Sequence, residues 1–387
     1  MQKKLIALAV AGLLSAPAFA QSNVTLYGTI DYGFSSLGDN MVEDAKSRSG
    51  IDSGISKQNR IGFKGVEDLG NGLKAVFVLE TGLNGDQGSM FNDMNRQSYA
   101  GLAGGFGTVA FGRHYTPQHL FTSAVDPFAK NGLGSAGNVL VQERRLNNLA
   151  AYISPTWSGF NFIAAYSFNG TAAAGFGGGN EAFQNNGDIQ AWAIAPSFTW
   201  GKLFVAANYH QASVNLNNGL VSNGSDDVDA LQVYDLYASY DFGIVKLGAT
   251  FGQRITDQEA LRAVTGNPLI DEDSKLTQWM IGATFKITPN DSILASYTQA
   301  TENDWNDDDN KGKLRQFAIG YEHALSKRTT LYAQAAWAKT NDDFEVASGF
   351  QGVLVTDGTY GGPASTYLGA DGMDYRRGFA VGFRHDF

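Results

Sequence analysis

The sequence predicts an all-β fold, a sixteen-stranded antiparallel transmembrane β-barrel, and three observations support this fold class. Apolar and polar residues alternate with a period of two over many segments, as in strands with lipid on one face and water on the other. Short turns and long polar loops alternate strictly between these segments. The chain also ends on such a strand, 379–387, whose last residue is the aromatic Phe387.

The first twenty residues have the pattern of a secretory signal peptide. A short basic stretch precedes an apolar run (5–14), and a small-x-small cleavage site ends at Ala20. The run is too short for a membrane-spanning helix, which needs about 20 residues. We therefore expect a signal peptide at 1–20 and a single β-barrel domain at 21–387. Its net charge would be −12 instead of −10, because two lysines leave with the signal peptide.

Composition excludes several other classes of protein. Only 17% of the residues are charged, below the quarter that is typical of soluble domains. No apolar run of 18 residues follows the signal segment, so no transmembrane helix is expected. The chain has 38 acidic and 28 basic residues, and this acidic balance argues against a nucleic-acid partner.

Sixteen segments carry the strand pattern, and an even number of strands with short turns at one end and long loops at the other is typical of outer-membrane barrels. A soluble β-sandwich would not give this alternation. We place the strands at 24–36, 55–68, 73–83, 92–103, 106–113, 145–155, 159–168, 189–199, 202–213, 229–240, 244–254, 275–287, 291–301, 312–323, 327–340 and 374–387. The short turns contain Gly, Asn, Asp and Pro, the usual turn residues. The long loops lie at roughly 37–54, 84–91, 114–144, 169–188, 214–228, 255–274, 302–311 and 341–373.

The two faces of a strand are clearest near the start of the chain. In the first strand, Leu26 and Ile30 share an apolar face, while Thr29 and Asp31 share the polar face. In the third strand, Glu80 lies on the polar face. We expect the apolar faces to contact lipid and the polar faces to line the barrel interior. The two ends of the chain should pair, residues near 24–34 with residues near 376–386.

Several segments resemble those of a known family, and they occur in the same order over nearly the whole mature chain. They are VTLYGTID at 24–31, NRIGFKGVEDLGNGLKA at 59–75, GFGTV at 105–109 followed by Gly112 and Arg113, LSKRT at 325–329 and GFRHDF at 382–387. Together they resemble the Gram-negative general diffusion porins, in particular the neisserial-type trimeric porins of β-proteobacteria. His385 stands where this family more often has an aromatic residue.

The resemblance implies a function as well as a fold. A porin of this kind is a homotrimer in the outer membrane of a Gram-negative bacterium, where it contacts lipid and lipopolysaccharide. It forms a water-filled channel for passive diffusion of small hydrophilic solutes and ions, and it is neither an enzyme nor dependent on a cofactor. The resemblance also implies that the barrel-insertion machinery recognises the Phe387 end. It further implies that the long third loop, 114–144, folds into the lumen and narrows it.

The resemblance implies a cluster of basic residues on the wall that faces this loop. The matching positions are Arg60, Arg96 and Arg145, and the alternation places Arg60 on the polar face independently. The candidate acids on the loop are Asp126 and Glu143, with Lys130 opposing them. Opposed charges of this kind create a field across the narrowest section of a pore and set its ion preference.

For two wall arginines, Arg145 and Arg113, the direction of the side chain depends on whether the alternation is strict. Leu146 and Tyr152 are expected to face lipid, which leaves Arg145 facing inward. Arg113 would share the lipid face with Val109 if the alternation were strict. A β-bulge or the end of the strand would turn it inward instead.

Other candidate sites are weaker, and we expect no metal site. The acidic run at 305–310 lacks the glycine and the final glutamate of a calcium loop, and His114 and His119 have no third ligand in view. A substrate-specific channel, for which Tyr27 is a possible aromatic lumen residue, is the alternative function. A barrel enzyme or an adhesin is less favoured. A hydrolase would need an outward Ser/His pair, and His385 has no obvious serine beside it.

The distribution of charge predicts the ion preference. Acidic loop segments at 226–229, 271–273 and 307–309 should gather cations at the mouth, whereas the wall arginines should favour anions at the neck. At physiological salt the Debye length is about 8 Å, so the mouth charges are screened more strongly than the neck charges. We therefore expect a mild preference for anions.

Overall fold

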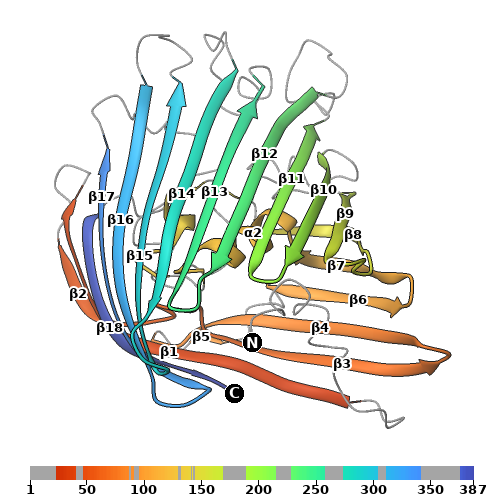
Figure 1. Cartoon of the computed structure of the whole chain (residues 1–387), viewed down its shortest axis with the longest axis horizontal. Helices are drawn as coiled ribbons and strands as arrows, with labels where there is room; N and C mark the ends of the chain where they lie inside the picture. Colours follow the sequence, from red (N-terminus) through yellow and green to blue (C-terminus); the bar gives the residue numbers. More distant parts are fainter. Residues whose placement is uncertain are drawn as a thin grey trace.

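In the computed structural model, β-strands form a closed antiparallel barrel (Figure 1). The described residues are 23–40, 47–86, 89–90, 96–129, 132–140, 142, 144–168, 189–214, 228–257, 273–303, 311–340 and 375–387. The predicted signal peptide and the predicted loop charges Lys130 and Glu143 lie outside them. Within the described part of the chain, no helix is long and apolar enough to cross a membrane.

Sixteen long strands make up the wall, which confirms the predicted fold class. They are β1 (Asn23–Asn40), β3 (Arg60–Gly70), β4 (Leu73–Asn84), β6 (Gln97–Gly104), β7 (Gly107–Tyr115), β8 (Arg145–Ile153), β9 (Phe160–Ser167), β10 (Ile189–Trp200), β11 (Leu203–Val214), β12 (Val228–Asp241), β13 (Val245–Thr256), β14 (Ser274–Lys286), β15 (Asp291–Asn303), β16 (Lys311–Ala324), β17 (Thr329–Thr340) and β18 (Tyr375–Asp386). The shorter elements are β2 (Arg48–Ser53), β5 (Ser89–Met90), helix α2 (Pro117–Val125) and the 3-10 turn η1 (Ala136–Asn138).

The barrel closes where its first and last strands pair. The β1–β18 ladder runs from Thr29 opposite Asp386 to Asn40 opposite Tyr375, so the predicted pairing of the two ends is confirmed. The ladder starts at Thr29 instead of residue 24 because Phe387 ends the chain opposite Gly28. Their backbones exchange two hydrogen bonds of 3.1 Å. A side chain on Gly28 would occupy the space of the Phe387 ring, so this glycine makes room for the last residue.

The alternation along β1 has the predicted orientation. Leu26 and Ile30 are exposed on the outer surface, while Thr29 and Asp31 are almost fully buried on the inner one. The same outer surface carries many large exposed apolar side chains from the other strands. An apolar band of this kind is what a barrel presents to lipid.

The predicted strand 55–68 is wrong at its start, because β3 begins only at Arg60. Residues 54–59 form an inward bend, hereafter the wall bend, and β2 lies within the predicted loop 37–54. Gly54 turns the chain with a φ of +73°. Asp31 then accepts hydrogen bonds from two backbone N–H groups of the bend, which are therefore not available to a strand ladder.

A second irregularity lies between β7 and β8. Their register shifts between Gly112 and His114, which confirms the predicted bulge next to Arg113. The prediction that Leu146 faces lipid is wrong. Leu146 is only 9% exposed and lines an internal cavity with Thr116, because the register shift changes which residues of β8 face inward.

Candidate functional site

The loop between β7 and β8, residues 116–144, begins at a closed base. The backbone N–H of Thr116 donates to the carbonyl of Arg144 over 3.1 Å, which ties the two ends of the loop together. The Thr116 hydroxyl accepts from the backbone N–H of His119 and so caps α2. Pro117 occupies the first turn, where its missing N–H costs no hydrogen bond.

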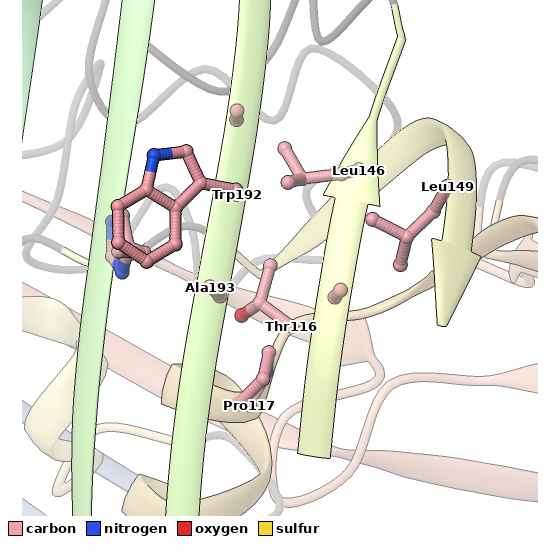
Figure 2. Close-up of a pocket in the computed structure, with 9 residues that line it drawn as sticks. Thr116, Pro117, Leu146, Leu149, Trp192 and Ala193 are labelled. Carbon is pink, nitrogen blue, oxygen red and sulfur yellow. The ribbon is translucent and has the colours of Figure 1, made fainter. Parts of the chain in front are cut away.

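Side chains from four strands, β8 to β11, surround this base. Figure 2 shows Thr116 and Pro117 at a small cavity with Leu146 and Leu149 from β8 and Ala193 from β10. The cavity measures about 20 Å³, which leaves room for little more than one water molecule. The first residues of the loop are therefore closely packed against the strands of the wall.

Helix α2 lies against the inner side of β10 to β13. Gln118 donates its side-chain amide to a carboxylate oxygen of Asp235 on β12 over 3.0 Å. Lys246 on β13 donates to the carbonyl of Ala124, near the end of the helix, over 2.7 Å. A cation is favourable at a helix C-terminus because the unpaired carbonyls there carry partial negative charge. These contacts hold α2 on the wall across the barrel from the loop's origin.

Beyond α2, the loop follows a row of small inward residues that are direct cross-strand partners. This small-residue row runs from β13 to β18 and consists of Gly248, Gly282, Ser296, Ala318, Ala336 and Gly378. A side chain on Gly248 would collide with the carbonyl oxygen of Val125, and one on Gly282 would lie 2.5 Å from Pro127. The loop backbone can approach the wall closely because these side chains are missing.

Hydrogen bonds pin the rest of the loop to β16 and β17. The backbone N–H of Leu133 donates to the side-chain oxygen of Gln334 over 3.1 Å. The amide groups of Asn138 and Gln316 bond to each other over 3.2 Å, and Gln316 also donates to the carbonyl of Ser135 over 3.1 Å. Segment 117–138, apart from positions 130 and 131, thus has contacts on the inner side of strands from β10 to β17.

The structure brings together the three predicted wall arginines, the arginine cluster Arg60, Arg96 and Arg145. Glu80 on β4 accepts from Arg96 over 2.7 Å and lies 3.8 Å from Arg60. Tyr115 connects Arg96 to Arg145, because its hydroxyl accepts from Arg96 over 2.7 Å and its ring lies 5.6 Å from the Arg145 guanidinium. The last contact has the distance of a cation–π interaction.

Three residues contact the arginine cluster although the sequence did not predict these contacts. They are Glu80, Tyr115 and Gln58. Alternation already placed Glu80 on the inner face, but nothing in the sequence connects it to arginines 20 and 16 positions away. Gln58 was assigned to a strand, whereas it lies in the wall bend, where its side chain accepts from Arg96. Tyr115 follows a register shift, so its direction could not be read from the alternation.

Burial and the nearby arginines together lower the pKa of His119 in the neighbouring loop. His119 of α2 stacks near Tyr115, with ring centroids 4.8 Å apart. Its pKa lies well below the usual range, first because the ring is buried and then because Arg144, Arg145 and other arginines stand nearby. The imidazole is therefore neutral at pH 7. Arg144, which the sequence analysis did not single out, adds a further positive charge beside the cluster.

Asp126, the predicted loop acid, is buried instead of facing open solvent. Its carboxylate accepts from the backbone N–H of Phe128 over 2.9 Å and from that of Ala136 over 2.8 Å. Burial raises its pKa to about 6 although these hydrogen bonds favour the charged form. Asp126 therefore connects two stretches of the loop. Among the described residues, no three His, Asp or Glu side chains gather as metal ligands do.

Comparison with known proteins places this barrel in a family. The family model described as Gram-negative porin matches residues 7–343. The chain belongs to the Gram-negative porin family. This porin is 31% identical to outer membrane porin protein 32 of Delftia acidovorans, with 100% of both chains covered. It is 30% identical to an outer membrane porin protein of Bordetella pertussis over 88% of this chain and 94% of the relative.

Solved structures agree with this assignment. An anion-selective porin from Comamonas acidovorans superposes with a TM-score of 0.70 at 27% identity, covering 95% of this porin and all of the other chain. The fold alone is shared with OmpT of Vibrio cholerae in its trimer form, at 17% identity and a TM-score of 0.64. Family and fold together identify a channel of the Gram-negative outer membrane, through which solutes pass by passive diffusion.

Proposed function

We propose that this porin passes small hydrophilic solutes and ions through a neck between the arginine cluster and the β7–β8 loop, and that the neck favours anions. One observation supports this most directly. Three guanidinium groups are linked on the inner face through Glu80 and Tyr115, which concentrates positive charge at one place on the wall. Burial first, and then the same arginines together with Arg144, lower the pKa of His119 in the neighbouring loop.

The position of these charges decides their effect on permeating ions. In the neck an ion passes within a few ångströms of the guanidinium groups, and the low-dielectric wall focuses their field. Acidic segments at 226–229, 271–273 and 307–309 lie mostly outside the described residues and are predicted at the mouth. Beyond a Debye length of about 8 Å, salt screens such charges. The relative from Comamonas acidovorans, described as anion-selective, supports the same preference.

The predicted site residues have different parts in this proposal. Arg60, Arg96 and Arg145 supply the positive side of the neck, and Lys130 and Glu143 remain proposed loop charges opposite them. Asp126 acts through the loop's conformation and not through its own field, because its carboxylate is buried and bonded to backbone N–H groups. The contacts of segment 117–138 support the proposal that the loop narrows the lumen.

The zero-current potential in a planar bilayer with a salt gradient tests the ion preference. Arg145→Glu and Arg60→Glu each replace a positive by a negative charge, so the potential should shift toward cation preference and for the double variant change sign. The control neutralises Asp307, Asp308 and Asp309 to Asn, which should change the potential little, and less still at high salt. A larger shift in the loop variant than in the arginine variants would place the selectivity at the mouth.

We also propose that the signal peptide is cleaved after Ala20 and that three copies of the chain assemble. Cleavage is supported by the small-x-small site of the sequence. Trimerisation is supported by family membership and by the related barrel whose structure is described as a trimer form. Together the two proposals predict the mass of the mature assembly.

A further inference from the structure

The wall bend, residues 54–59, is held by one carboxylate. Asp31 on β1 accepts from the backbone N–H of Ser56 over 2.8 Å and from that of Lys57 over 2.7 Å. The Tyr332 hydroxyl on β17 donates to its other oxygen over 2.6 Å. In return, the side chain of Asn59 accepts from the Asp31 backbone N–H over 2.6 Å. The bend is therefore a defined conformation that several strands determine together.

The bend lies on the inner side of the wall. Arg384 on β18 donates to the Ser56 hydroxyl over 2.6 Å, and Lys57 forms an ion pair of 2.6 Å with Asp386. Gly33 lies two positions after Asp31 in β1 and so on the same face of the strand. A side chain on Gly33 would lie 3.0 Å from Ile55. Like Asp31, the residues that the bend contacts belong to the inward sets of β1 and β18.

The bend also meets the β7–β8 loop. Ile55 is fully buried, in an apolar cluster that includes Phe128 and Leu133 of that loop and Leu37 of β1. Burying an isoleucine side chain stabilises such a cluster because its apolar surface is removed from water. The far part of the loop therefore ends against the bend, and a displacement of either one exposes apolar surface on the other.

Finally, the bend contacts two members of the arginine cluster. The backbone carbonyl of Gln58 accepts from the Nε of Arg60 over 3.2 Å. The side-chain oxygen of Gln58 accepts from Arg96, whose other groups bond to Glu80 and Tyr115. One residue of the bend thus restrains the direction of two guanidinium groups that a long, flexible side chain would otherwise leave variable.

We infer that the wall bend is the second half of the neck. It orients Arg60 and Arg96 through Gln58 and seats the β7–β8 loop through Ile55, with Asp31 as the positioning residue for both. This inference rests on the proposed neck and adds to it a selectivity determinant in the wall itself.

The variant Asp31→Ala separates positioning from charge. By charge alone, loss of a carboxylate from the lumen wall should raise the preference for anions. Alanine offers the bend no acceptor, so we expect the arginines to lose their restraint and the anion preference to fall, with larger fluctuations of the open-channel current. Glu302→Ala removes an equal charge from β15, where the carboxylate accepts from Ser274 of β14, and is the matched control. A rise in anion preference in both variants would overturn the inference.

A second test leaves Asp31 intact. The chain has no cysteine, so a single introduced thiol is labelled without background. A negatively charged methanethiosulfonate reagent on Gln58→Cys should lower the unit conductance and shift selectivity toward cations. The same reagent on Lys202→Cys, at an exposed turn, should do neither. If labelled Arg145→Cys responds and labelled Gln58→Cys does not, the neck stands and the bend is not part of it; if neither responds, the proposed neck itself fails.

Discussion

At the scale of single residues, burial decides what each charged group of this porin does. Glu80 and Asp126 are both carboxylates of the barrel interior, and both are almost fully buried. Glu80 pairs with arginines, so in the proposed neck it reduces the net positive charge that an ion would meet. Asp126 pairs with backbone N–H groups of its own loop, so it stabilises a conformation. Because both residues are acidic, residue type alone does not distinguish the role of Glu80 from that of Asp126.

The raised pKa of Asp126 predicts a pH dependence of the loop. In the closed loop the pKa is about 6, whereas an opened loop has the ordinary value of 3.8, so the closed form binds the proton more tightly. Its stability should be greatest at low pH and fall as pH rises from about 4 to about 6, by about 1.4 kcal/mol for each unit of pKa difference. Above pH 6 it should be constant.

Hydrogen exchange measures this effect. After correction for the intrinsic rate, protection of the Phe128 and Ala136 amides should decrease between pH 4 and pH 6. Asp126→Asn has no titrating group at this position and should abolish the dependence. It should also lower protection of one of the two amides, because its NH2 group replaces one of the two acceptor oxygens. Equal pH profiles in the two proteins would show that another group controls the loop.

At the scale of elements, small side chains on several strands determine how closely the loop lies against the wall. Each member of the small-residue row is the direct partner of the next, so the row forms a continuous path across six strands. Loop atoms lie where side chains of Gly248 and Gly282 would be. In the proposed neck, the free cross-section beside the arginine cluster would therefore depend on residues of β13 and β14.

The variant Gly248→Leu tests this dependence. Its side chain would occupy the position of the Val125 carbonyl, so residues 125–127 must move toward the lumen. Overpacking of this kind costs about 1–3 kcal/mol, too little to unfold a closed barrel. We expect the unit conductance in a planar bilayer to fall. Ala249→Leu on the outer face of the same strand is the matched control and should conduct like the parent. Unchanged conductance in both would show that the loop does not limit the flow.

At the scale of the whole molecule, the barrel closes by pairing the first long strand of the wall with the last. Residues 29–40 pair with 375–386, more than 300 positions later in the chain, and Phe387 completes the ladder opposite Gly28. Open edges are not tolerated in lipid because unpaired backbone groups there cost several kcal/mol each. The outer apolar band remains available for lipid and, in the proposed assembly, for two neighbouring copies.

Native mass spectrometry of the protein in mild detergent tests processing and assembly together. The main species should have three times the mass of residues 21–387. Heating should release single chains, each with the mass of residues 21–387, and this mass serves as the internal control. A mass that includes Met1 would contradict cleavage after Ala20, and a monomer as the main species before heating would contradict the trimer.

The alternation of apolar and polar residues by itself determined the barrel, its sixteen strands and the inward direction of Arg60 and Glu80. It did so because a side-chain period of two is a local property of a strand between lipid and water. The wall bend and the buried side of Leu146 were decided only by the tertiary structure. At these places backbone N–H groups bond to partners such as Asp31 instead of a ladder, or the register shifts, and the alternation no longer indicates direction. The arginine cluster likewise depends on Glu80 and Tyr115, which three-dimensional folding alone brings beside Arg96.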